Sequence, residues 1–119
     1  KYHVSASVLS PSAVGMGPVT DAVAIATVRA TIDTGISLLD TAQAYRTSEA
    51  TLGRALRDGY RQRCFLATKV SGNYSPASIQ QAMDNSLKAL GVDEVDLYQI
   101  HSWNPQYPVA ASIGAMLKL

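Results

Sequence analysis

The sequence predicts an α/β fold in which parallel strands alternate with helices. Four short apolar runs, each suited to a buried strand, are separated by segments with helical periodicity. Residues that start and stop helices flank those segments in the expected order. Alternation at this spacing indicates a parallel sheet with helical crossovers, and about four βα units fit into 119 residues. An open doubly wound sheet and a piece of a (β/α)8 barrel both fit this pattern.

The composition predicts one well-buried globular domain. Of the 119 residues, 47% are hydrophobic and 16% are charged, and the net charge of +1 gives no electrostatic footprint for nucleic acid. No apolar run approaches the ~20 residues of a membrane span and no signal-peptide pattern is present, so we expect no membrane partner and a cytoplasmic location. The single cysteine, Cys64, excludes an internal disulfide and is predicted to be a buried structural thiol.

The first 35 residues predict a strand and a helix. Short β-like pieces are closed by the turn Gly15-Met16-Gly17-Pro18. As a dinucleotide loop this turn is a weak signal, because Thr20 stands where the fingerprint requires its third glycine. Thr20 can instead cap a helix that ends near Gly35. The apolar stripe of that helix consists of Ile25, Val28 and Ile32.

The second unit begins with the apolar run 36–39, which stops at Asp40. Tyr45 lies in the following loop, and Thr47 or Ser48 can start a helix. Gly53 inside that helix costs about 1 kcal/mol relative to alanine. We therefore expect another group to pack or bind closely at Gly53.

The last two units follow the same plan. The run 64–70 has Lys69 near its end, and Ser75-Pro76 marks the start of a helix that stops at Gly91. A fourth run, 95–100, stops at His101. Residues 109–119 predict a helix that continues to the end of the chain.

Three polar residues, Asp40, Lys69 and His101, end three consecutive strand runs. The carboxyl ends of parallel strands lie on one side of a sheet, so these side chains should converge, and Tyr45 can reach the same place. A tyrosine has an unperturbed pKa near ~10, and a nearby lysine ammonium lowers it by favouring the phenolate. An aspartate would orient that lysine, and a histidine could hydrogen-bond a substrate oxygen.

Such a set suits proton delivery to a carbonyl oxygen while another group attacks the carbon. The histidines and carboxylates show no metal-ligand spacing, so no metal site is predicted. A bound hydride donor is the natural supplier of the second group.

Four segments resemble the aldo-keto reductases in order and spacing. They are Leu39-Asp-Thr-Ala-Gln-Ala-Tyr45, Ser48-Glu-Ala-Thr-Leu-Gly-Arg-Ala-Leu56, Ala67-Thr-Lys-Val70 and Ser86-Leu-Lys-Ala-Leu-Gly-Val-Asp-Glu-Val-Asp-Leu-Tyr-Gln-Ile-His101. The resemblance implies a (β/α)8 barrel that reduces aldehydes and ketones with NADPH or NADH. It also implies a catalytic tetrad consisting of Asp40, Tyr45, Lys69 and His101, with Tyr45 as the proton donor.

The same resemblance implies where ligands bind. Gly15, Met16 and Gly17 would lie beside the nicotinamide together with Asp40, and Trp103 would line the substrate pocket with Tyr45 and His101. Arg46 is a departure, because the family frequently has glycine there.

A complete barrel takes about 250 residues, so residues 1–119 predict a single incomplete domain, the N-terminal half of the barrel. The chain starts at Lys1 without methionine and looks cut at both ends. We expect it to be inactive alone and to self-associate through open sheet edges near residues 11–14 and 95–100. Two other functions stay open: a catalytically silent binding or regulatory protein on this fold, and a lyase that uses Lys69 as a Schiff-base nucleophile.

Overall fold

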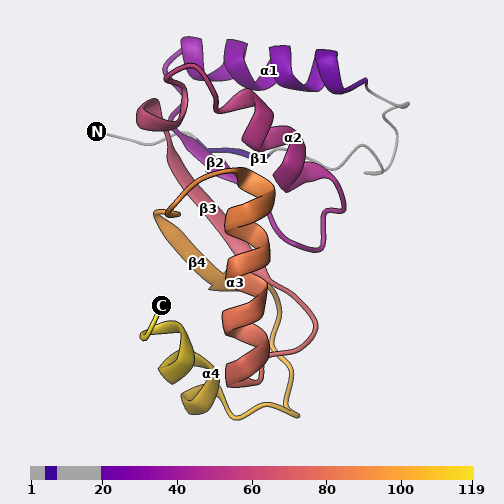
Figure 1. Ribbon diagram of the computed structural model, residues 1–119, viewed down its shortest axis with the longest axis vertical. Helices are drawn as coiled ribbons and strands as arrows, with labels where there is room; N and C mark the ends of the chain where they lie inside the picture. The colour runs from indigo at the N-terminus through magenta and orange to yellow at the C-terminus, as the bar shows by residue number, and fades with distance from the viewer. Residues whose placement is uncertain (1–4, 8–19) are drawn as a thin grey trace.

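The computed structural model describes residues 5–7 and 20–119 (Figure 1). Strands and helices alternate along the described residues as predicted, with a 3₁₀ turn at Arg61–Arg63 before the third strand. The elements are β1 (Ser5–Ser7), α1 (Asp21–Asp33), β2 (Leu38–Asp40), α2 (Ser48–Ala55), β3 (Phe65–Val70), α3 (Pro76–Leu90), β4 (Leu97–Ile100) and α4 (Val109–Met116). All neighbouring strands pair in parallel, in the order β1-β2-β3-β4.

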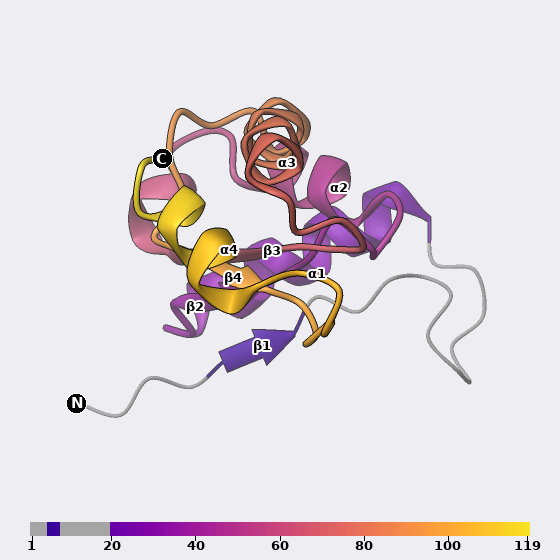
Figure 2. The same cartoon turned by 90° about the horizontal axis from the view of Figure 1, so that it is seen from below.

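One face of the sheet forms the core. The register aligns Leu39 of β2 with Leu66 of β3, and both side chains are fully buried. Figure 2 shows α2 and α3 on the same side of the sheet. The larger of the two apolar clusters among the described residues consists of Val28, Ile32, Leu39, Leu52, Ala55, Leu56, Cys64, Leu66 and Leu90.

The other face carries the polar strand ends. Asp40 is aligned with Ala67, and Lys69 follows two residues later on β3, so Asp40 and Lys69 share this face. Phe65 and Leu97 belong to it as well, and they are 44% and 41% exposed.

The predicted helix caps are confirmed. The Thr20 side chain accepts a hydrogen bond from the Val23 amide, and Ser75 does the same for the Ser78 amide at the start of α3. Gly91 ends α3 in the left-handed conformation, with φ of 65°. Local side-chain chemistry therefore fixes where α1 and α3 begin.

Gly53 lies where α2 meets the end of α3. A Cβ atom added to Gly53 would lie 2.4 Å from the carbonyl oxygen of Leu90 and 2.9 Å from that of Ala89. The predicted close packing at this glycine is confirmed.

One predicted segment lies outside the described residues, and one helix boundary differs from the sequence prediction. Residues 11–14 and the turn 15–18 lie outside the described residues, and the strand that pairs with β2 is Ser5–Ser7. Backbone groups make this pairing, so Ser5–Ser7 pairs with β2 without a run of apolar side chains. The last helix stops at Met116 rather than at residue 119, because the amides of Lys118 and Leu119 donate to carbonyl oxygens three residues back rather than four.

No helix within residues 20–119 is long and apolar enough to cross a bilayer.

Candidate active site

Asp40 and Lys69 form an ion pair across neighbouring strands. Lys69 Nζ lies 2.5 Å from Asp40 Oδ2 and also donates to the Thr41 carbonyl oxygen at 2.9 Å. The Lys69 side chain is 14% exposed and that of Asp40 is 27% exposed. These two oxygen acceptors fix the direction of the Lys69 amine group.

The loop after β2 places Tyr45 beside this ion pair. The Thr41 and Gln43 amides donate to the Ala67 and Lys69 carbonyl oxygens at 3.0 and 3.1 Å, which continues the β2–β3 pairing beyond the strand. The hydroxyls of Thr41 and Ser48, both buried, lie 2.9 Å apart and tie the loop to α2. Lys69 Nζ then lies 5.5 Å from the centroid of the Tyr45 ring, within the range of a cation–π contact.

His101 completes the cluster from the end of β4. Its amide donates to the Val70 carbonyl oxygen at 3.0 Å, so β3 and β4 stay paired up to this residue. Its ring meets the Tyr45 ring edge to face, with centroids 5.4 Å apart and planes at 89°. Nδ1 of His101 lies 2.9 Å from Ser71 Oγ.

The structure thus brings together Asp40, Tyr45, Lys69 and His101 at the carboxyl ends of the strands. The cluster contains one phenol, one imidazole and one ammonium–carboxylate pair. A phenol can donate a proton, the ammonium can stabilise the phenolate that is left, and an imidazole can hydrogen-bond an oxygen that accepts the proton.

The other predicted ligand-binding residues have a different status. Trp103 is 76% exposed on the loop after β4 and makes no ring contact with this cluster. Gly15, Met16 and Gly17 lie outside the described residues. Within the described part of the chain, no group of three or more His, Cys, Asp and Glu residues could hold a metal ion.

Sequence reasoning missed two polar contacts near the cluster. Ser71 contacts His101, and Glu49, only 6% exposed, accepts a hydrogen bond from the buried Thr68 hydroxyl at 2.7 Å. The one available signal was position: Thr68 and Ser71 flank the end of the strand that carries Lys69. The departure at Arg46 has a structural counterpart, because Arg46 has a left-handed φ of 52°, a conformation that favours glycine.

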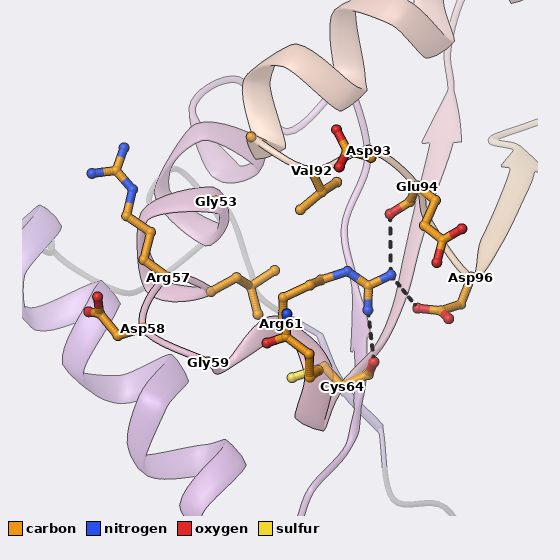
Figure 3. Close-up of a pocket in the computed structure, with 13 residues that line it drawn as sticks. Gly53, Arg57, Asp58, Gly59, Arg61, Cys64, Val92, Asp93, Glu94 and Asp96 are labelled. Carbon is orange, nitrogen blue, oxygen red and sulfur yellow. Dashed lines mark hydrogen bonds and ion pairs between the residues drawn. The ribbon is translucent and has the colours of Figure 1, made fainter.

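A hollow of about 850 Å³ lies at the opposite end of the sheet between residues 57–62 and 91–96 (Figure 3). Arg61 crosses it and donates to the carbonyl oxygens of Cys64 and Glu94 and to the carboxylate of Asp96. Cys64 lines this hollow as the predicted buried thiol, and burial raises its pKa. These contacts join the amino ends of β3 and β4, whereas Asp40, Tyr45, Lys69 and His101 lie at the carboxyl ends of the strands.

Comparison with known proteins agrees with this geometry. A model of the aldo/keto reductase family matches residues 11–119. The chain belongs to the aldo/keto reductase family. Aldo-keto reductase YhdN of Bacillus subtilis is 36% identical over 115 residues, which cover 87% of this chain and 35% of YhdN.

Solved aldo-keto reductases have the same arrangement of elements. The holo form of a Bacillus halodurans enzyme is 29% identical with a TM-score of 0.85, over 98% of this chain and 41% of that enzyme. A Klebsiella pneumoniae enzyme in complex with NADP and acetate is 37% identical with a TM-score of 0.75, over 80% of this chain and 34% of that enzyme. These relatives are (β/α)8 barrels, so the predicted fold class is confirmed: the chain consists of parallel βα units that form part of such a barrel.

Proposed function

We propose that this chain carries the catalytic side chains of an NAD(P)H-dependent oxidoreductase that reduces aldehydes and ketones to alcohols. The observation that carries the proposal is the ion pair of Lys69 with Asp40 beside the rings of Tyr45 and His101. Family membership supports the reaction class. The chain spans 35% of YhdN, and the activity of the whole barrel is part of this proposal.

Each side chain has a distinct role in this proposal. Tyr45 donates its hydroxyl proton to the carbonyl oxygen of the substrate, which becomes the alcohol oxygen. The Lys69 ammonium stabilises the phenolate that remains on Tyr45, and Asp40 holds Lys69 charged and oriented. His101 donates a hydrogen bond to the same carbonyl oxygen and aims it at Tyr45. Trp103 would cover the substrate from the loop after β4.

The donor set fits a nicotinamide cofactor. The four side chains can hold, orient and deliver a proton, but none of them can release a hydride. When bound, NADPH or NADH supplies that hydride. Asp40, whose side chain is 27% exposed, can accept a hydrogen bond from a cofactor hydroxyl group. Gly15, Met16 and Gly17 are the other proposed cofactor contacts, and a Klebsiella pneumoniae relative solved with NADPH supports this choice of cofactor.

The geometry favours this reaction over a lyase. A Schiff-base lysine must present a neutral amine to the substrate carbonyl. Lys69 instead donates to Asp40 at 2.5 Å and to the Thr41 carbonyl oxygen at 2.9 Å, contacts that direct Nζ toward protein oxygens. A lysine held in this way serves as a fixed charge rather than as a nucleophile.

Turnover of NADPH separates the enzyme from a silent binding or regulatory protein. The test uses a chimera in which this chain replaces the matching segment of YhdN, with 4-nitrobenzaldehyde as a broad carbonyl substrate. We expect the chimera to oxidise NADPH and the 119-residue chain alone to be inactive. A folded chimera that binds NADPH by fluorescence titration but consumes none would favour the silent protein.

We also propose that residues 1–119 form the first part of one barrel domain and that two copies associate through open sheet edges. β1 and β4 end the strand order, and unpaired strand edges promote pairing with other chains. Light scattering that gives the mass of a monomer at working concentration would contradict self-association. A cytoplasmic location stays a prediction, and the free thiol of Cys64 agrees with a reducing compartment.

A further inference from the structure

We propose that Ser71 is a positioning residue that sets the tautomer and the ring orientation of His101. Ser71 directly follows β3, and its hydroxyl oxygen lies 2.9 Å from Nδ1 of His101. The contact joins the ends of two paired strands, 30 residues apart in the sequence. Ser71 is not one of the four side chains to which the proposed function gives a part in the reaction.

The main chain around His101 is already fixed by other groups. The His101 amide donates to the Val70 carbonyl oxygen at 3.0 Å, and the next amide, that of Ser102, donates to the Tyr74 hydroxyl oxygen at 3.4 Å. Tyr74 is 3% exposed and is held by its own contact with the Ser102 hydroxyl. With the backbone held, the direction of the imidazole depends on its side-chain contacts.

Two contacts define the ring. The edge-to-face contact with Tyr45 sets the plane of the His101 ring. The contact between Ser71 and Nδ1 turns that nitrogen toward the end of β3, so Nε2 faces away from β3. A neutral imidazole has one N–H donor and one acceptor nitrogen. When the Ser71 hydroxyl donates to Nδ1, the proton of the imidazole must lie on Nε2.

The direction of this hydrogen bond rests on the proposed function. A carbonyl oxygen only accepts hydrogen bonds, so His101 can orient a carbonyl substrate only by offering an N–H group. Donation by Ser71 leaves Nε2–H free for that purpose. The reverse arrangement, with Nδ1–H donating to Ser71, would present a lone pair that repels the carbonyl oxygen.

Nitrogen NMR of the 119-residue chain tests the inference without turnover or cofactor. Protonated and unprotonated ring nitrogens have well-separated ¹⁵N shifts, and the chain contains only one other histidine, His3, so a His101→Gln variant assigns the signals. The spectra are recorded at about pH 8.5, where an ordinary imidazole is neutral. We expect His101 to have a protonated Nε2 and an acceptor Nδ1, with a ring-to-ring nuclear Overhauser effect to Tyr45.

Variants of Ser71 give the matched comparison. In Ser71→Ala both His101 nitrogen shifts should move toward the averaged values of a histidine in a short peptide, and the Tyr45 effect should weaken. Ser71→Thr keeps the hydroxyl and should retain the wild-type shifts. Valine has nearly the same shape as threonine but no hydroxyl, so Ser71→Val should resemble Ser71→Ala. This Thr and Val pair separates the hydroxyl from any change in packing.

Two results would overturn the inference. One is a wild-type His101 protonated on Nδ1, and the other is a set of nitrogen shifts that Ser71→Ala and Ser71→Val leave unchanged. The outcome is independent of turnover. An inactive chimera with Nε2–H set by Ser71 would count against the proposed function alone, and an active chimera with unchanged shifts would count against Ser71 alone.

Discussion

Replacing Gly53 by alanine sets helix propensity against packing. In the interior of an exposed helix, alanine is about 1 kcal/mol more favourable than glycine. At Gly53, however, the new Cβ would lie 2.4 Å from the Leu90 carbonyl oxygen and 2.7 Å from its carbon. The closest ordinary contact of a Cβ atom is 3.4 Å, so α3 must move by roughly 1 Å away from α2.

The packing effect should exceed the propensity gain. The obstacle is the backbone of α3, which cannot rotate away, and the contact lies beside the fully buried Leu52 and Ala55. Overpacking of this kind costs about 1–3 kcal/mol, and a backbone obstacle places the cost near the upper end. After subtraction of the propensity gain, Gly53→Ala should destabilise the chain by about 2 kcal/mol and lower Tm by roughly 8 °C.

Gly114 provides the matched control. It also lies inside a helix, α4, but a Cβ atom added there meets no atom within 4 Å. Gly114→Ala should therefore stabilise the chain by about 0.5–1 kcal/mol. Thermal and urea unfolding followed by circular dichroism measure both variants. A Gly53→Ala chain as stable as the wild type would refute the close approach of α2 and α3.

One further substitution, at Arg46, and one change of pH test local features of the fold. Arg46→Gly should stabilise the chain by about 1 kcal/mol, because the left-handed φ of 52° strains every residue except glycine. Arg46→Ala keeps that strain and is the control. An equal Tm for the two variants would contradict the prediction. The free energy of unfolding should fall as pH rises past about 9–10. Burial raises the pKa of Tyr98, and the charge of Glu49 adds a smaller increase. Burial also raises the pKa of Cys64. The unfolded chain then releases protons that the native chain retains. Urea midpoints at about pH 8 and 10.5 measure this loss of stability, and Tyr98→Phe should make the loss smaller. An equal loss in Tyr98→Phe would show that Tyr98 does not contribute to it.

The elements that the sequence predicted well are those that local chemistry determines. Thr20 caps α1, Ser75 and Pro76 start α3, and the unfavourable Gly53 correctly indicated a close helix contact. The strand β1 was not predicted at Ser5–Ser7, because its pairing with β2 depends on backbone groups and leaves little trace in the side chains.

The candidate site likewise contains residues that could be predicted from the sequence and one that could not. Asp40, Lys69 and His101 could be found because each marks the end of an apolar run, and parallel strands bring such ends together. Ser71 could not be found, because a serine after a strand has many roles and its contact with His101 depends on the register of β3 and β4. The contacts that orient a site were thus harder to predict than the residues that form it.

The measurement that tests the central claim most directly is the kcat of a Tyr45→Phe chimera with NADPH and 4-nitrobenzaldehyde. Removal of the proton donor should lower kcat by about 100-fold or more, because general acid catalysis contributes 10²–10⁴-fold. Fluorescence titration should show unchanged NADPH binding. Tyr60→Phe, which removes a hydroxyl that bonds to Asp33 near the hollow at the other end of the sheet, is the matched control and should keep the wild-type kcat. A Tyr45→Phe chimera that reduces the aldehyde as fast as the unmodified one would contradict the assignment of Tyr45 as the proton donor.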